Sequence, residues 1–349
     1  MRVLRAPAAL SLACVLALAQ NSTTTFRENV RLVHVLATVK DEGGAPVGSL
    51  EKGDFEVRDN GVPQEIAVFE RQTEQPLSIA ILVDDSASTA IDLKYETDSV
   101  TRFVKALVRS GNPDDAASLY TFNWEIVQQT AFTRNAAAID KRLRQVRGDG
   151  GTAMYDAILL ASRDIEDRQG RKVLVIVTDG GDTVSRATFG RAAEAAQLAD
   201  AVIFPVLVVP ISNNAGRNIG GENALTTLAE RTGGRVFQPT IGKEMDAAFD
   251  GILRDLRTQY LLGFYPKNVP LTRERFHTLT VTGMGHANAA WTISARSGYY
   301  GEALPAANAS ANSSGDVNLS APDETVRAPK PAAKSTQRGA STTTGRGTR

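Results

Sequence analysis

The stretch Leu77-Ser-Ile-Ala-Ile-Leu-Val-Asp-Asp-Ser-Ala-Ser88 decides the fold. Its first seven residues form an almost continuous apolar run, which is typical of a strand buried on both faces of a parallel sheet. The run then changes at once to aspartates and serines, namely Asp84, Asp85, Ser86 and Ser88. Open α/β sheets bind ligands just outside the carboxyl ends of their strands, and carboxylate and hydroxyl oxygens suit a hard cation such as Mg²⁺. The stretch therefore predicts a cation site at a strand end.

Two later stretches supply matching oxygens. Gly148-Asp-Gly-Gly-Thr152 is a flexible loop that opens a helix predicted over 153–167, and it presents the Thr152 hydroxyl. Lys172-Val-Leu-Val-Ile-Val-Thr-Asp179 is a second apolar strand, which ends in Asp179 before two glycines. Because parallel strands end at the same edge of a sheet, these oxygens are expected to lie near Ser86 and Ser88.

The triplet Asp84-x-Ser86-x-Ser88, then Thr152, then Asp179 resembles the metal-ion-dependent adhesion site of von Willebrand factor A domains in order and spacing. The resemblance covers roughly residues 76–257. It implies Mg²⁺, or Mn²⁺ or Ca²⁺ in its place, with the three hydroxyls as direct ligands and the two aspartates acting mostly through water. It also implies a partner protein that offers a Glu or Asp carboxylate to the ion. Neutral hydroxyls leave a divalent ion under-neutralised, so an incoming carboxylate is strongly favoured.

The sequence departs from that family pattern at two positions. Asp85 replaces a small or hydroxyl residue, and Thr89 stands where an apolar residue such as Met is common. Asp85 adds negative charge beside the cation, as Asp182 could from its loop, but both are expected to face solvent. Partner specificity is expected in the surrounding loops, at Asn123–Trp124, Gly180–Arg186 and Ile211–Gly221.

Each predicted ligand could instead have a purely structural role. Ser86, Ser88 and Thr152 could cap the helices that follow them, and Asp179 before two glycines could simply make a turn. A metal-independent scaffold of the cell envelope, with an empty site, is the alternative that such roles would favour. One shared site nevertheless explains all the residues together.

Enzyme chemistry fits less well than binding. A haloacid-dehalogenase phosphatase needs a second acid two residues after its nucleophile, where this chain has Ser86. A serine hydrolase needs a base, but the three histidines, His34, His277 and His286, lie outside the α/β region. No glycine pattern follows the first strand to approach a nucleotide phosphate. A metal-dependent hydrolase or phosphatase is therefore the less favoured alternative.

The order of patterns predicts an α/β fold with a flanking β-sandwich. From Leu77 strands alternate with helices, which indicates a doubly wound, mostly parallel sheet of six strands, the last at 235–237. Strand periodicity at 30–40, a hairpin around Asn60-Gly61, and strands near 259–265, 276–282 and 291–296 predict a small sandwich of N- and C-terminal strands. The predicted regions are 1–19, a signal peptide; 26–75, a β region; 76–257, the α/β domain; 258–301, β strands; and 302–349, a disordered tail.

The beginning of the chain predicts export. Arg2 and Arg5 precede an apolar run over 8–18 and an Ala17-Leu-Ala19 cleavage site, a signal-peptide pattern too short to span a bilayer. The lone cysteine, Cys14, lies within it, so the mature chain would have no disulfide or Cys nucleophile. The 39 basic and 39 acidic side chains balance, which argues against nucleic acid as a partner. We expect a periplasmic, envelope or extracellular protein, similar in layout to secreted A-domain proteins of acidobacteria.

Overall fold

The computed structural model describes residues 32–71, 75–90, 92–208, 218–270, 275–284 and 291–301. The predicted signal peptide, the predicted tail, His286 and residues 211–217 of one predicted specificity loop lie outside the described residues. Within those ranges, no helix has the length and apolar character needed to cross a bilayer.

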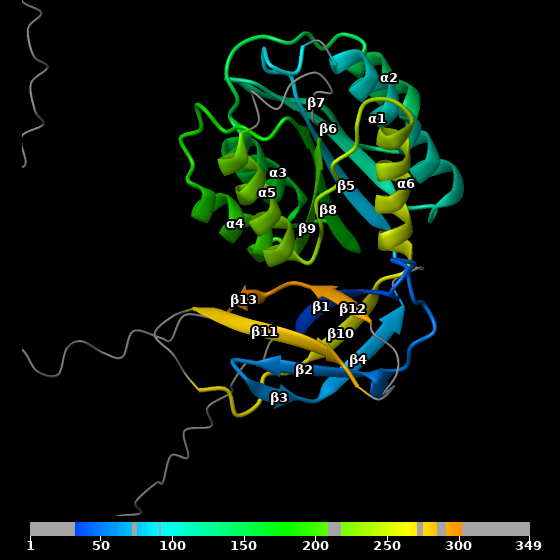
Figure 1. Ribbon diagram of the computed structural model, residues 1–349, viewed down its shortest axis with the longest axis vertical. Coiled ribbons are helices and arrows are strands. Elements are labelled where there is room, and N and C mark those ends of the chain that lie inside the picture. Colours follow the sequence, from blue (N-terminus) through cyan, green and yellow to red (C-terminus); the bar gives the residue numbers. More distant parts are fainter. Residues whose placement is uncertain are drawn as a thin grey trace, which may run out of the picture. The chain divides into compact units, whose positions relative to one another are not determined.

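A five-stranded sheet forms the centre of the α/β domain (Figure 1), in the order β7-β6-β5-β8-β9. Strand β5, the apolar run of the sequence, lies in the middle and pairs in parallel with β6 and β8. Strand β9 extends the parallel set, whereas β7 pairs antiparallel with β6 at the edge. The strands are β5 (Leu77–Asp84), β6 (Ala116–Phe122), β7 (Ile126–Thr133), β8 (Arg171–Thr178) and β9 (Ala201–Leu207).

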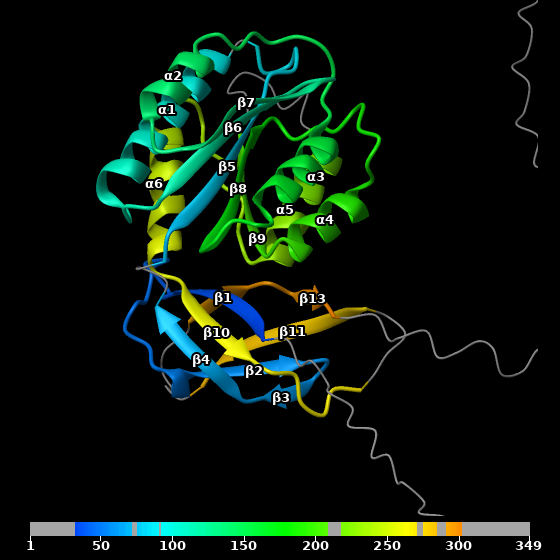
Figure 2. The same cartoon turned by 180° about the vertical axis from the view of Figure 1, so that it is seen from behind.

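In the described ranges, six α-helices cover this sheet, three on each face (Figures 1 and 2). The first group is α1 (Leu93–Ser110), α2 (Ala136–Leu143) and α6 (Lys243–Arg257), and the second is α3 (Met154–Ile165), α4 (Phe189–Leu198) and α5 (Ile219–Thr232). Alternate side chains of β5 serve the two faces: Ile79 and Ile81 pack with α1 and α6, and Ala80 and Leu82 with α3 and α4. This explains why the β5 sequence is apolar throughout rather than alternating.

The predicted sixth strand is reduced to one bridge in the described part of the chain. Phe237 donates its N–H to the Pro205 carbonyl at 2.8 Å and accepts from Leu207 N at 2.8 Å. The segment cannot extend, because Gly233 ends α5 in a left-handed conformation and Pro239, two residues on, has no N–H to donate. The α/β fold class is confirmed, with a five-stranded sheet rather than six.

The N- and C-terminal strands form two antiparallel four-stranded sheets, in the orders β12-β1-β10-β4 and β13-β11-β2-β3. Phe55 of one sheet packs on Tyr260 of the other, with 5.1 Å between ring centroids. The first sheet holds β1 (Val33–Lys40), β4 (Ile66–Arg71), β10 (Tyr260–Phe264) and β12 (Thr292–Ala295). The second holds β2 (Phe55–Asp59), preceded by the short 3₁₀ helix η1 (Lys52–Asp54), then β3 (Val62–Gln64), β11 (Phe276–Gly283) and β13 (Gly298–Tyr300).

The α/β domain is inserted between two neighbouring strands of the first sheet. The last residue of β4, Arg71, pairs with the first residue of β10, Tyr260. The chain therefore leaves the sheet and returns to it at adjacent positions, which explains why neither sequence half has enough strands to close a core alone. The predicted Asn60-Gly61 turn joins β2 to β3, with φ of 46° and 81° as a two-residue hairpin of this kind requires.

Candidate metal centre

Asp84 is the fixed point of the candidate site. It ends β5, is fully buried, and its Oδ1 accepts a hydrogen bond from Ser86 N at 2.9 Å. Its Oδ2 accepts from Thr178 Oγ1, the last residue of β8, at 2.6 Å. Burial raises the Asp84 pKa to about 6, the hydrogen bonds from Thr178 and Ser86 oppose this, and the nearby charge of Asp179 adds to it. Asp84 is therefore held at the junction of two strand ends, with Asp179 close by.

The two serines come together in the loop after β5. Ser86 Oγ and Ser88 Oγ lie 3.1 Å apart, with Ser86 buried and Ser88 exposed. Thr89, the departure from the family pattern, closes this loop by donating its hydroxyl to the carbonyls of Asp84 and Ser86 at 3.0 and 3.1 Å. The capping role is wrong for both serines, because α1 begins at Leu93 and its N-cap is Asp92.

Thr152 is tied to both neighbouring loops. On one side, Asp149 N donates to the Asp85 carbonyl at 2.9 Å and Ala87 N to the Gly150 carbonyl at 3.2 Å, which binds the Thr152 loop to the serine loop. On the other, Thr152 N donates to Thr183 Oγ1 at 2.8 Å, in the loop after Asp179. Thr152 is buried and is not the N-cap of α3, which is Ala153.

Close backbone packing holds these loops in place. A Cβ added at Gly148 would lie 2.7 Å from the Cβ of Ala90, and one at Gly221 would lie 1.3 Å from the Gly180 carbonyl oxygen. The first contact joins the Thr152 loop to the serine loop, and the second joins the start of α5 to the loop after Asp179. Glycine is needed at both positions because any side chain would push the loops apart.

Of the two acids predicted to face solvent, Asp85 is buried and Asp182 is only partly exposed. Asp85 is only 8 % exposed, its Oδ1 has no hydrogen-bond partner, and burial followed by the charge of Asp84 raises its pKa to about 7. Asp182 is partly buried, and its Oδ1 accepts from Tyr155 N at 3.1 Å and from Ser185 Oγ at 2.5 Å. The prediction failed because both loops fold back against neighbouring segments that are distant in sequence.

The donor set has the chemistry of a hard-cation site. It offers three hydroxyls and two carboxylates, the oxygen ligands that Mg²⁺ accepts alongside bound water. In the described ranges no three His, Cys, Asp or Glu side chains gather as metal ligands, so an all-carboxylate or thiolate centre does not fit. The residues present do fit an ion held largely by hydroxyls and water.

Sequence reasoning missed Glu96, in the first turn of α1. It is 1 % exposed, and neither of its carboxylate oxygens has a hydrogen-bond partner. Burial, then the charges of Asp84, Asp92 and Asp179, raises its pKa well above the usual value. The helical periodicity of the sequence could have indicated that Glu96 is buried, since Glu96 falls on the same face of α1 as the buried Leu93 and Val100.

The surface beside the site is basic and carries one exposed aromatic ring. A groove runs along Ala90, Lys94 and Asp98 on one side and 143–148 on the other, where Arg144 and Arg147 are exposed. Arg144 is paired with Asp140 at 3.1 Å. Trp124, in the turn between β6 and β7, is 64 % exposed and its ring lies against Gly150.

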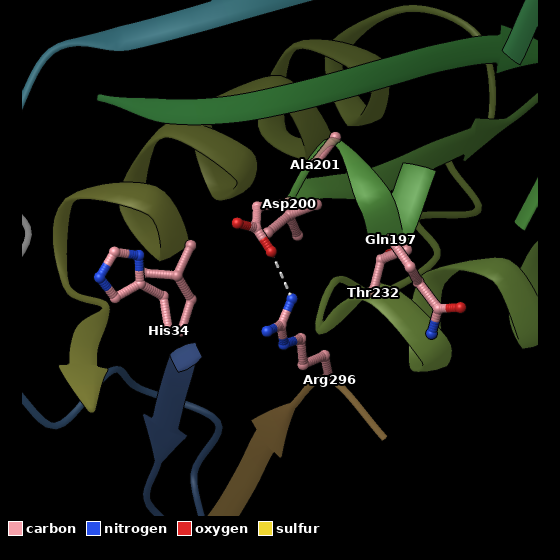
Figure 3. Close-up of a pocket in the computed structure, with 8 residues that line it drawn as sticks. His34, Gln197, Asp200, Ala201, Thr232 and Arg296 are labelled. Atoms are coloured by element: carbon pink, nitrogen blue, oxygen red, sulfur yellow. Dashed lines mark hydrogen bonds and ion pairs between the residues drawn. The ribbon is translucent and has the colours of Figure 1, made fainter. Parts of the chain in front are cut away.

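A second pocket, shown in Figure 3, lies at the amino end of β9, away from the strand ends that carry Asp84 and Asp179. Arg296 Nη1 crosses it to donate to Asp200 Oδ1 at 2.7 Å, and the Thr232 hydroxyl is bonded to the α5 carbonyls of Leu228 and Ala229. Its charged groups thus neutralise each other, as in a structural contact, while His34 is exposed at its rim.

A family model of the von Willebrand factor type A domain matches residues 79–181, the segment that runs from β5 to the glycines after Asp179. The chain contains a von Willebrand factor type A domain. A domains are commonly protein-interaction and adhesion modules and are generally not enzymes. The matched segment includes every residue of the candidate site.

Several solved structures are similar to the A domain. The protein BatB from Bacteroides thetaiotaomicron is 18 % identical over 52 % of this chain and 97 % of its own, with a TM-score of 0.42. The von Willebrand factor domain of the type V pili tip protein Mfa5 from Porphyromonas gingivalis is 14 % identical over 51 % and 94 %, with a TM-score of 0.42. An aerotolerance-related membrane protein from Bacteroides fragilis is 17 % identical over 52 % and 98 %, with a TM-score of 0.40. No curated protein matches the chain.

Proposed function

We propose that the A domain binds a divalent cation, Mg²⁺ in the first place, and through it an acidic side chain of a partner protein. Ser86, Ser88 and Thr152 would hold the ion directly, and Asp84 and Asp179 would act through water. When bound, the ion supplies a positive centre that an incoming carboxylate can complete. The observation that carries the proposal is the pair of serine hydroxyls 3.1 Å apart, turned together at a strand end and not used as helix caps.

The state of Asp84 supports a role through water. Each of its oxygens already accepts one hydrogen bond from the protein, from Ser86 N and from Thr178 Oγ1. A carboxylate oriented by two donors in this way contributes charge and fixes the loop, as the supporting residues of metal sites do. The neutral hydroxyls of Ser86 and Ser88 remain for the ion itself.

The surroundings of the site favour an acidic protein partner. Lys94 and Arg147 are exposed along the adjacent groove, so their charge would attract a negative segment next to the coordinating carboxylate. Trp124 offers a large exposed ring on the neighbouring loop, and tryptophan is enriched among residues that dominate binding energy. The chain has no histidine between residues 76 and 257, which leaves Ser86 without the usual base and favours binding over hydrolysis.

Thermal unfolding with and without Mg²⁺, Mn²⁺ or Ca²⁺ tests the cation. A ligand at one hundred times its Kd stabilises the folded state by about 2.7 kcal/mol. For a domain of this size that raises Tm by about 5–10 °C. Ser86→Ala should remove the shift, whereas Ser162→Ala, a buried serine on α3, should keep it. An equal Mg²⁺ response in wild type and Ser86→Ala would contradict the proposal.

Affinity capture from the envelope of the producing cells, with wild type and Ser86→Ala in parallel, tests the partner. Binding should be lost in EDTA, be restored by Mg²⁺, and disappear when the critical Glu or Asp of the captured protein is changed to its amide. A partner retained equally in EDTA and by Ser86→Ala would instead indicate a metal-independent scaffold.

Export belongs to the same proposal and is supported by the charged and apolar pattern of residues 2–19. Amino-terminal sequencing of the protein from its own cells should give Gln20 as the first residue. An intact Met1 on the cytoplasmic protein would contradict it.

A further inference from the structure

Glu96 is a buried carboxylate without a partner. It is 1 % exposed, and both of its oxygens lack a hydrogen bond to the described part of the chain. Burying an ionised carboxylate without a compensating group is strongly unfavourable, and native proteins generally pair such groups or let them bind metals. Glu96 therefore requires a ligand or a proton that the protein itself does not supply.

The charged groups that raise the pKa of Glu96 are acidic. They are Asp84, Asp92 and Asp179, in that order, and they act after the burial of its carboxyl group. Two of these three are the aspartates of the proposed cation site. A cation in that site would be attracted by Glu96, Asp84 and Asp179 together, and it would relieve the repulsion among them.

The helix position alone does not explain this residue. An acid in the first turn of α1 gains a modest stabilisation from the helix dipole, and an exposed acid would gain the same. Asp92 already occupies the N-cap position. The penalty for burying an unpaired carboxylate is several times larger, so the gain at the helix end does not account for the burial of Glu96.

We propose that Glu96 is a third carboxylate of the cation site, acting on the ion through water and making the domain hold its cation when no partner is present. We do not propose that Glu96 contacts the ion directly, because in the described ranges no three acidic side chains lie close enough together to ligate one metal ion. The inference rests on the proposed function of this site and adds a residue outside its five-residue motif. A greater count of ligand charges is one of the means by which oxygen sites for divalent ions become tighter.

Glu96→Gln tests this in the full chain, with unfolding curves and calorimetric titration of Mg²⁺. Without metal, the variant should unfold at the same temperature as wild type or higher, because an amide removes the free-energy cost of burying a carboxylate. With metal, its Kd for Mg²⁺ should be roughly ten- to a hundredfold weaker, as found when residues supporting a metal ligand are removed. A variant more stable without the ion and less responsive to it is not expected of a residue that serves packing alone.

Asp115→Asn is the matched control. Asp115 is equally buried, but it lies before β6, at the opposite end of the sheet, and accepts hydrogen bonds from Leu77 N and Asn112 N, each at 2.8 Å. Its amide variant should lose the same stability with and without Mg²⁺. Glu96→Met, of similar length and without charge, repeats the test should the glutamine variant fold poorly.

The outcomes separate the two proposals. Wild-type stabilisation by Mg²⁺ that is lost in Ser86→Ala but unchanged in Glu96→Gln would overturn the role of Glu96 and leave the cation site standing. No Mg²⁺ response in wild type would overturn both. A weakened Mg²⁺ Kd in Glu96→Gln and Glu96→Met, with Asp115→Asn unaffected, supports the third carboxylate.

Discussion

The hydrogen bond from Thr178 Oγ1 to Asp84 Oδ2 is expected to be one of the polar contacts that stabilise the folded A domain most. It is 2.6 Å long, both residues are fully buried, and it joins the carboxyl ends of the neighbouring strands β5 and β8. The same hydroxyl accepts from Gly180 N at 3.1 Å. Thr178→Val preserves the shape of the side chain and removes only these two interactions.

The magnitude follows from the two partners. A hydrogen bond to a charged group contributes about 1.5–3 kcal/mol and a neutral one about 1 kcal/mol. Thr178→Val should therefore lower the free energy of unfolding by about 2–4 kcal/mol, which is about 5–15 °C in Tm for a domain of this size. Thr178→Ser keeps the hydroxyl and loses a single methyl, so it should cost about 1 kcal/mol.

Thermal and urea unfolding of the two variants beside wild type measures this difference. The valine variant should also respond less to Mg²⁺, because Asp84 loses the donor that orients it. If the valine and serine variants unfold within about 1 °C of each other, the Thr178 hydroxyl does not hold Asp84 in place.

Two further substitutions test the backbone on which the site and the sandwich depend. Gly221→Ala should lower the free energy of unfolding by more than about 3 kcal/mol and abolish the rise in Tm with Mg²⁺, because its Cβ would lie 1.3 Å from the Gly180 carbonyl oxygen. Gly190→Ala is the control: only the Thr188 hydroxyl lies near its Cβ, so the rise in Tm with Mg²⁺ should remain. Gly61→Ala should cost about 1–2 kcal/mol in urea unfolding, since φ there is 81°, whereas Gly48→Ala, with open space and no left-handed φ, should be nearly neutral.

The main features of the fold could be predicted because each depends on a local pattern. The apolar run of β5 indicates a strand buried on both faces, and its alternate residues do pack against opposite helix layers. The Asn60-Gly61 pair fixes a two-residue hairpin by itself. The sixth strand was wrong because only five residues separate Gly233, which ends α5, from Pro239, and this is too little backbone to form a ladder.

The environment of the acids could not be predicted, because it depends on contacts between distant segments. Asp85 becomes buried when Asp149 N, 64 positions further along the chain, bonds to its carbonyl. Asp182 is held by Tyr155 N and so joins the start of α3. A polar residue in a glycine-rich loop looks solvated until the loops are assembled, which is why burial was assigned wrongly where charge matters most.

Charge at this site sets two properties against each other. Asp84 has each oxygen engaged by the protein, so the atoms left to face an ion are mainly neutral hydroxyls. Neutral ligands leave the ion strongly attractive to a partner's carboxylate but weakly held in its absence. Glu96, as a buried third acid, favours retention of the ion. Asp85 is also buried, has one oxygen without a hydrogen-bond partner, and adds to the negative charge around the ion. An A domain with this set of acids is therefore expected to bind its cation before it binds its partner. The ion should then contribute less to the affinity for the partner's carboxylate than it would in a site with only two aspartates. The groove residues Lys94 and Arg147 and the exposed ring of Trp124 are then the features that must supply the remaining affinity.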